Sequence, residues 1–242
     1  MYKKLKNITK FIIPKSIIRK IEKLIRGLVS LPYRGSRYEC NVCETKLRKF
    51  IILDNGNKLC PNCGSLPRTR RLWDLIKFDL EGKTVLHFSP SNSLNQRIVK
   101  SNVKKYITTD YEGEFQADEQ YDIQAIELPD NSIDIVLCYH ILEHIPNDRD
   151  AIDELYRTLK PGGVCYIQTP FKDGNIYEDD TITSPEDRLN HFGQEDHLRI
   201  YSVEGLKSRL EKSGFIVEVL TYENENDSNG FKQDETIIRA KK

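Results

Sequence analysis

The sequence predicts an α/β protein in which a small cysteine-rich module precedes a doubly wound, mostly parallel sheet. The main observation is that segment 131–170 is typical of a strand, a helix and a second strand. An apolar run at 133–138 suits a strand buried on both faces, apolar residues at 150–159 have helical spacing, and 164–168 is again apolar. Such crossovers place their two strands in parallel. The other observation is two Cys-x-x-Cys pairs upstream of this unit.

Length and composition set further bounds. A chain of 242 residues with 37 Lys/Arg and 37 Asp/Glu suits one medium domain plus an accessory module, and nucleic acid is not expected as its partner. No apolar run approaches the roughly 20 residues of a membrane span, and we see no secretory signal. Four of six cysteines are paired in sequence, while Cys138 and Cys165 fall in predicted strands. This usage favours a reducing, cytoplasmic location.

The N-terminal segment predicts an amphipathic helix at 14–29, with Pro14 in its first turn. Its apolar stripe consists of Ile17, Ile18, Ile21, Leu24, Ile25 and Leu28. Residues 1–39 hold eleven Lys/Arg against two Glu. We favour a helix packed on the body of the protein, because one apolar stripe is typical of a core-facing helix. The alternative is peripheral contact with an anionic membrane.

A four-cysteine metal site follows this helix. Cys40-x-x-Cys43 and Cys60-x-x-Cys63 are separated by sixteen residues, a spacing typical of a zinc ribbon. Four thiolates complete a tetrahedron and leave no position for a catalytic water, so the expected Zn²⁺ is structural. An Asn-Gly turn at 55–56 predicts a hairpin between the two pairs.

A helix is predicted to begin at Pro67 and to extend through Ile76, with Arg68, Arg70 and Arg71 on its solvated face. The predicted divisions of the chain are an N-terminal helical segment at 1–36, a zinc ribbon at 37–66, and a large α/β domain at 67–242.

Two consecutive motifs resemble a known family. The strings DNSIDIVLCYHILEHI and LYRTLKPGG resemble the strand-four to strand-five signature of class I methyltransferases that use S-adenosylmethionine (SAM), of the type 11-like kind. The resemblance extends over roughly 12–220 and includes the ribbon, a first loop LHFSP and a late motif HFGQEDHLRIYS. It implies a Rossmann-like methyltransferase sheet whose last strand is antiparallel.

The cofactor is expected at the carboxyl ends of the parallel strands. A strand at 83–88 leads into a loop, 89–93, which lacks the glycines usual in the family but offers hydroxyls at a helix start. A strand at 106–109 ends at Asp110, whose carboxylate can accept both ribose hydroxyls. The resemblance implies an adenine contact at 122–123. The predicted cofactor-binding residues are His87, Ser89, Ser91, Asp110, Tyr111, Asp122, Ile123 and Tyr139.

The polar segment 171–200 is expected to close over the site or to be mobile, because it lacks periodicity and is rich in ionisable groups. We predict His191 and His197 as catalytic residues on the acceptor side, and His144 as a third, since histidine titrates near neutrality. Glu143 is an alternative that would orient the acceptor. The last strands, 215–220 and 236–240, are joined by a polar run expected to be an exposed loop.

The predicted function is methyl transfer from SAM to nitrogen or oxygen of a small polar or glycan acceptor. A non-catalytic alternative is a ribbon and Rossmann-like module that acts as a scaffold in a sugar- or nucleic-acid-modifying complex. A dehydrogenase fits less well, because the first loop lacks the glycines that admit a pyrophosphate. The oligomeric state stays open.

Overall fold

The structure is a computed structural model that describes residues 15–223 and 227–242, without the side chains of 15–20 and 23. Pro14 therefore lies outside the described residues. The chain divides into two compact units. Of the described residues, the first unit holds 15–77 and 227–232, and the second holds 78–223 and 233–242. The helix after the ribbon thus belongs to the first unit.

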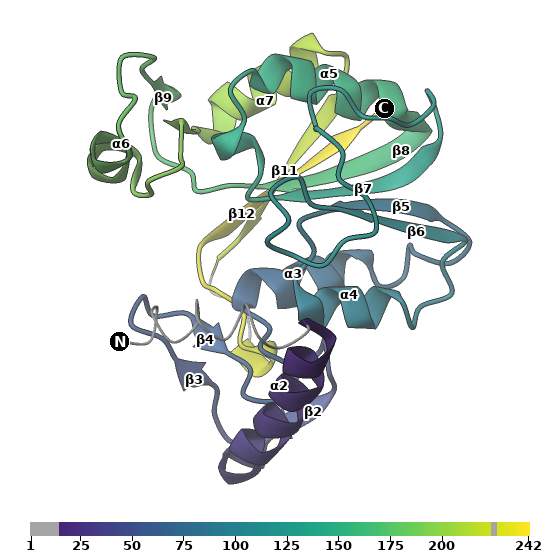
Figure 1. The fold of residues 1–242 in the computed structure, drawn as a ribbon, viewed down its shortest axis with the longest axis vertical. Coiled ribbons are helices and arrows are strands. Elements are labelled where there is room, and N and C mark those ends of the chain that lie inside the picture. Colours follow the sequence, from purple (N-terminus) through teal and green to yellow (C-terminus); the bar gives the residue numbers. More distant parts are fainter. Residues whose placement is uncertain (1–14, 224–226) are drawn as a thin grey trace. The chain divides into compact units, whose positions relative to one another are not determined.

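The first unit combines short strands with two helices (Figure 1). Its elements are α2 (Lys15–Ser30), η1 (Leu31–Tyr33), β1 (Arg34–Cys40), β2 (Thr45–Leu47), β3 (Ile51–Ile52), β4 (Lys58–Leu59), α3 (Pro67–Ile76) and η3 (Asp227–Asn229). β1 pairs with β2, and β3 pairs with β4, both antiparallel. The predicted hairpin is therefore present, and Gly56 takes the left-handed φ of +77° that its turn requires.

The apolar stripe of α2 is exposed in its described part. Ile21 is 45 % exposed, Leu24 68 %, Ile25 52 % and Leu28 61 %. The expectation that this stripe packs on the protein is therefore wrong for these four residues. Among the described residues, no helix is long and apolar enough to cross a membrane.

Two of the three arginines of α3, Arg70 and Arg71, are buried, so the prediction of a solvated face is wrong for them. The Arg70 guanidinium donates to the carbonyls of Ser65 at 2.7 Å, Lys58 at 2.8 Å and Gly230 at 2.5 Å. Burial is tolerated because carbonyl acceptors replace water around a charge that stays on the group. Arginine's fork geometry makes several such bonds possible at once.

The run expected to be an exposed loop between the last two strands is partly buried in the first unit. Gly230 and Phe231 are buried, and the Asn229 amide donates to the Glu39 carbonyl at 2.9 Å. Asp227 forms an ion pair with Lys58. This docking could not be predicted from the sequence, because the run is polar and its partners are 169 to 190 residues away.

The second unit contains the predicted sheet. In the described chain its order is β11-β12-β8-β7-β5-β6, with β6, β5, β7 and β8 parallel and β12 antiparallel to both β8 and β11. This confirms the predicted fold class. The elements are β5 (Thr84–Phe88), α4 (Asn92–Ile98), β6 (Lys105–Thr109), β7 (Ile133–Tyr139), η2 (Leu142–His144), α5 (Asp148–Thr158), β8 (Leu159–Gln168), β9 (Tyr177–Glu178), α6 (Pro185–Phe192), β10 (Arg199–Ile200), α7 (Val203–Lys212), β11 (Ile216–Tyr222) and β12 (Glu235–Lys241).

Helices cover both faces of this sheet, with α5 and α7 on one face and α4 on the other (Figure 1). All five residues of β5 are buried as a consequence. The core on the α5 side includes Val136 of β7, Leu155 of α5 and Leu206 of α7, each fully or almost fully buried. Burial of each such side chain stabilises the fold by about 1.5–3 kcal/mol.

The Pro-Gly-Gly turn at 161–163 lies within a strand. α5 ends at Thr158, and β8 begins at the next residue, Leu159. The β7–β8 register shifts near the start of the pair, which makes the turn a bulge. Gly162 has a φ of +79°, and a side chain at Gly163 would lie 2.9 Å from a backbone oxygen. Both glycines are therefore required here.

Candidate functional site

Four cysteine sulfurs gather in the first unit. The Sγ atoms of Cys40 and Cys63 are 3.7 Å apart, as are those of Cys43 and Cys60, and all four lie within 4.8 Å of one another. A tetrahedral site with Zn–S bonds of about 2.3 Å has sulfur–sulfur edges of roughly 3.8 Å. The geometry therefore fits a small tetrahedral metal site.

The two Cys-x-x-Cys loops have the same local backbone. The Glu44 amide donates to the Cys40 carbonyl at 2.7 Å, and the Gly64 amide donates to the Cys60 carbonyl at 2.9 Å. Glu44 and Gly64 each directly follow a second cysteine, and their φ values are +58° and +75°. Each loop thus closes through a left-handed residue, which turns both of its thiols toward the same point.

At the carboxyl edge of the sheet in the second unit, Asp110 meets the loop after β5. Asp110 directly follows β6 and is buried. Its Oδ1 accepts from the Ser89 hydroxyl at 2.7 Å, and its Oδ2 accepts from the Phe115 amide at 2.9 Å. Each carboxylate oxygen has a further lone pair, so the pair of oxygens can still accept ligand hydroxyls.

Ser89 stands where the family's loop is usually glycine-rich. Its φ of +45° is left-handed, the conformation that glycine adopts most easily. The Ser89 hydroxyl is bonded to Asp110, so the serine joins the β5 loop to the end of β6. Ser89 thus adopts, without glycine, a left-handed backbone conformation at the end of β5.

The other predicted cofactor residues lie around this edge with different exposure. His87 is buried in β5, where burial lowers its pKa to about 3, and its Nδ1 lies 2.8 Å from the Tyr106 hydroxyl. Ser91 precedes the seven-residue α4 without capping it. The Tyr111 ring is 58 % exposed, and Tyr139 ends β7.

Asp122 and Ile123 lie in a segment without helix. The Asp122 carboxylate accepts from the Gln124 amide at 2.8 Å, while Ile123 is buried in the core. No helix occurs between 111 and 132 in the described chain. The adenine contact of these two residues stays a prediction.

A second cluster of ionisable groups follows β7. Glu143 and His144 belong to η2, and His197 comes from the late polar segment. One ligand atom from each residue lies within 4.8 Å of the other two. The rings of His144 and His197 meet edge to face with centroids 4.7 Å apart. Glu143 is 1 % exposed and His197 3 % exposed, whereas the His144 side chain is 29 % exposed, so the cluster meets solvent through His144.

Hydrogen bonds fix the side chains of this cluster. His197 Nδ1 lies 3.2 Å from the Phe192 carbonyl, and only a protonated nitrogen can donate there, so Nε2 carries the lone pair of the neutral ring. Glu143 Oε1 accepts from His140 Nδ1 at 3.2 Å. His197 Nε2 and Glu143 Oε2 are buried without a hydrogen-bond partner among the described residues.

The electrostatics follow from burial and from these contacts. Burial lowers the pKa of His197, and the neighbouring His144 lowers it further. Burial alone would raise the pKa of Glu143, but the hydrogen bond and charge of His140 outweigh it, so this pKa lies below the usual range. His144 Nδ1 lies 3.2 Å from a carboxylate oxygen of Asp196. Glu143 is therefore an anion beside two imidazoles near neutral pH.

The two residues that follow His197 in the polar segment 171–200 form hydrogen bonds with η2 and its neighbours. The Leu198 amide donates to the Glu143 carbonyl at 2.9 Å. The buried Arg199 guanidinium donates to the carbonyls of Leu142 at 3.1 Å and Pro146 at 2.9 Å. Sequence analysis included Arg199 only among many polar groups and missed this role. Its β10 placement and its carbonyl partners, more than 50 residues upstream, are tertiary information.

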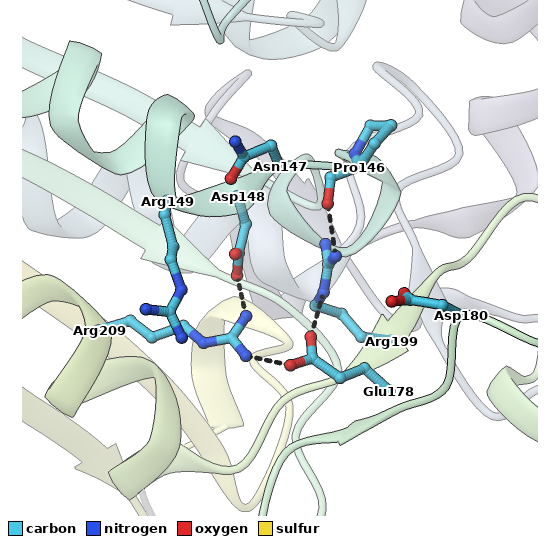
Figure 2. A pocket seen from close by; sticks show the side chains of 8 residues that line it. All are labelled: Pro146, Asn147, Asp148, Arg149, Glu178, Asp180, Arg199 and Arg209. Carbon is cyan, nitrogen blue, oxygen red and sulfur yellow. Dashed lines mark hydrogen bonds and ion pairs between the residues drawn. The ribbon is translucent and has the colours of Figure 1, made fainter.

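An ion-pair network extends this attachment. Figure 2 shows Arg199 and Arg209 on either side of Glu178, with Asp148 beyond Arg209. Burial raises the pKa of Glu178, but hydrogen bonds from Arg209 and Arg199 lower it more, and the net shift is downward. The hollow between these groups is also lined by Pro146, Asn147, Arg149 and Asp180. The network ties β9 and β10 to the start of α5.

His191 lies outside the cluster. It is exposed on α6, and its Nδ1 lies 2.6 Å from the Tyr177 hydroxyl. Of the three predicted catalytic histidines, the structure brings His144 and His197 together and places His191 with a tyrosine instead. It also adds the buried Glu143, which the sequence suggested only as an alternative.

Comparison with known proteins identifies the second unit. A model of the methyltransferase domain family matches residues 68–219, more than half of the chain. The chain belongs to this methyltransferase family. Its second unit is therefore an enzyme domain, as predicted, and SAM is the cofactor that the family implies.

Individual relatives agree with this assignment. A probable S-adenosylmethionine-dependent methyltransferase of Mycolicibacterium smegmatis is 32 % identical over 99 residues, which are 40 % of this chain and 34 % of that protein. The match thus spans about a third of that relative. Two solved SAM-dependent methyltransferases share the fold. One from Mesorhizobium loti has a TM-score of 0.53 at 12 % identity, covering 70 % of this chain and 97 % of that one. One from Archaeoglobus fulgidus has 0.50 at 20 %, covering 72 % and 93 %.

Proposed function

We propose that this methyltransferase transfers the methyl group of SAM to a nitrogen or oxygen atom of a polar small molecule or a glycan. The observation that carries the proposal is the cluster of Glu143, His144 and His197, which follows β7 at the carboxyl edge of the sheet. Ligands of open α/β sheets bind beyond this edge. Buried atoms without partners, at His197 and Glu143, suit a polar acceptor better than an apolar one.

On the cofactor side, Asp110 and Ser89 are the residues suited to hold SAM. The Asp110 carboxylate would accept the ribose hydroxyls, and the exposed Tyr111 ring would lie against the adenine. SAM supplies a methyl carbon already activated by its sulfonium. The protein therefore acts mainly by holding the acceptor atom in line with that carbon.

On the acceptor side, we assign His144 and His197 the task of binding the acceptor and receiving its proton. A nitrogen or oxygen nucleophile must lose a proton during transfer, and a neighbouring acceptor group accelerates this step. Glu143 would orient the acceptor through the same cluster. A role for His191 stays a prediction, since its described contacts do not connect it to the cluster.

Calorimetry with S-adenosylhomocysteine tests the cofactor assignment. We expect micromolar binding by the wild type and roughly 10- to 100-fold weaker binding by Asp110→Ala, because a hydrogen-bonded charge is lost. Asp173→Ala, which changes an exposed aspartate in a loop, is the matched control and should bind like the wild type. Undiminished binding by Asp110→Ala would contradict the assignment.

The non-catalytic alternative rests on one observation. The Ser89 hydroxyl already occupies one oxygen of Asp110, and no glycine lies in this loop. A module that had lost its cofactor would give no heat with S-adenosylhomocysteine in the same calorimeter. That outcome would favour a scaffold role over methyl transfer.

We also propose that Cys40, Cys43, Cys60 and Cys63 hold one structural Zn²⁺. The support is the pair of 3.7 Å sulfur–sulfur edges and the closed set of four thiolates. Metal analysis of freshly purified, reduced protein should find about one zinc per chain. All six cysteines are free of disulfides, which supports a reducing, cytoplasmic location.

Finally, we propose that α2 contacts anionic membranes at their surface. Support comes from its five exposed apolar side chains, Ile21, Leu24, Ile25, Leu28 and Val29, and from the excess of Lys/Arg in residues 1–39. The full chain should co-sediment with vesicles containing phosphatidylglycerol more than with pure phosphatidylcholine. Leu24→Glu combined with Leu28→Glu should abolish this difference. Equal sedimentation of the wild type with both vesicles would remove the proposal.

A further inference from the structure

We propose that Glu143, His144 and His197 form a binding site for a first-row divalent cation, distinct from the four-cysteine site. A role of this cation in activating the acceptor rests on the proposed methyl transfer, but the presence of the site does not. Two imidazoles and one carboxylate within 4.8 Å of one another are a ligand set that proteins use for zinc, iron and related ions. Imidazole favours such ions over Mg²⁺ or Ca²⁺, which prefer oxygen.

The Nδ1 atoms of both histidines have partners of the kind that metal-ligating histidines have. A ligating histidine almost always uses its second ring nitrogen to donate to a carbonyl or a carboxylate. His197 Nδ1 faces the Phe192 carbonyl at 3.2 Å, and His144 Nδ1 faces Asp196 at 3.2 Å. In each ring this leaves Nε2 as the coordinating atom. The Phe192 carbonyl thus fixes the tautomer of His197, and Asp196 lies within ion-pair distance of His144.

The third ligand, Glu143, likewise has one oxygen held by a neighbour and one oxygen available to a cation. Glu143 Oε1 is held by His140, while Oε2 is buried with no described partner. His197 Nε2 is also buried and without a partner. Both side chains are more than nine-tenths buried, and leaving such atoms unpaired is costly. A cation between them would satisfy both atoms with a single ligand.

The two halves of the site are held together by backbone contacts. The Leu198 amide donates to the Glu143 carbonyl, and Arg199 donates to the Leu142 and Pro146 carbonyls on the other side of η2. The cluster is therefore a fixed arrangement of side chains, which a metal site requires because its ligands must be positioned to within a fraction of an ångström.

Three protein ligands leave coordination positions open on the cation, whereas four cysteine ligands leave none. An acceptor hydroxyl that occupies one of them would have its pKa lowered, so its proton would leave to solvent near neutral pH. With the cation bound, the cation therefore replaces His144 and His197 as the group that activates the acceptor, and the two histidines act as its ligands. The oxygen's electron pair then attacks the methyl carbon of SAM. The carbon–sulfur bond breaks with its electrons on sulfur, which gives the methyl ether and S-adenosylhomocysteine. The inference thus narrows the acceptor to a molecule that offers an oxygen ligand.

Calorimetric titration of Mn²⁺ into full chain that holds one zinc per chain, at the four-cysteine site, tests the second site, because thiolates disfavour Mn²⁺. We expect one additional Mn²⁺ per chain. Glu143→Gln and His197→Gln should weaken this binding at least tenfold. His191→Gln is the matched control, since it changes an exposed histidine outside the cluster, and it should bind like the wild type. A wild type without Mn²⁺ binding, or variants that bind equally well, would overturn the proposal.

Two further measurements test the site independently of the variants. Electron spin-echo spectra of the Mn²⁺-loaded wild type should show coupling to imidazole nitrogen, and spectra without it would overturn the proposal even if the variants fail to fold. S-adenosylhomocysteine binding is measured separately. If it binds while Mn²⁺ does not, the metal site fails and methyl transfer stands. If Mn²⁺ binds while S-adenosylhomocysteine does not, the proposed function fails and the site stands.

Discussion

The two ligand clusters of this protein, one in each unit, differ in how they are closed. Four sulfurs converge in the first unit within 4.8 Å and leave no open position. In the second unit one ligand atom from a carboxylate and one from each of two imidazoles also lie within 4.8 Å of one another, but they supply only three ligands. From this contrast we propose a structural role for the closed cluster and a chemical role for the open one.

The two clusters also share one structural feature. Each cluster depends on a buried arginine that donates to backbone carbonyls of the ligand-bearing segments. Arg70 binds the Ser65 and Lys58 carbonyls beside the cysteines, and Arg199 binds the Leu142 and Pro146 carbonyls around η2. The ligands differ, but the same chemistry orders the backbone that presents them.

Removing one ligand of the closed cluster should have the largest effect. Structural zinc contributes about 10–16 kcal/mol in small domains, so Cys60→Ser should lose the metal and unfold the first unit. Zinc content and hydrogen exchange of residues 15–77 measure this. Cys165→Ala is the control, because this buried thiol is not near the cluster in sequence and should cost only about 1 kcal/mol with zinc retained. Full exchange protection in Cys60→Ser would contradict a structural role.

Replacing either buried arginine by lysine should have the next largest effect on stability. Arg70→Lys and Arg199→Lys each leave buried carbonyls unpaired and should each lower the free energy of unfolding by about 3 kcal/mol. Hydrogen exchange should localise the Arg70→Lys effect to the first unit and the Arg199→Lys effect to η2 and the late segment. The account fails here if Arg199→Lys leaves the exchange of η2 unchanged.

Glu178→Gln should have the smallest effect. The Glu178 side chain is 38 % exposed, so after solvent screening its ion pairs with Arg199 and Arg209 should contribute at most about 1 kcal/mol. Its pKa is lowered in the folded state, so this contribution is complete above the unfolded pKa of about 4.3 and is lost as pH falls through the folded value. Denaturant melts of both proteins should therefore differ at pH 7 and converge in acid; a gap that widens in acid would refute this.

The closed cluster was predictable from sequence and the open cluster was not. Cys-x-x-Cys loops bring two thiols together by local backbone geometry, so spacing alone predicts the ligands of the first unit. His197 reaches Glu143 only because Leu198 and Arg199 dock on η2, more than 50 residues upstream. No periodicity or turn chemistry encodes that contact.

The fold likewise has features that the sequence predicts and features that it does not. The sheet was predictable because buried strands such as β5 and β7 are mostly apolar runs between breakers. The burial of Arg70 and of Gly230 was not, since both depend on carbonyl partners or neighbours supplied by distant segments. Local patterns predict elements, whereas buried polar contacts between distant segments require the structure.

One measurement tests the central contrast most directly: diffraction from crystals grown with Mn²⁺ and S-adenosylhomocysteine, with anomalous data for both metals. The account predicts zinc among the four sulfurs, manganese bound to His197 Nε2 and Glu143 Oε2, and the cofactor's ribose on Asp110. Crystals that hold the cofactor but show no manganese between Glu143, His144 and His197 would contradict it.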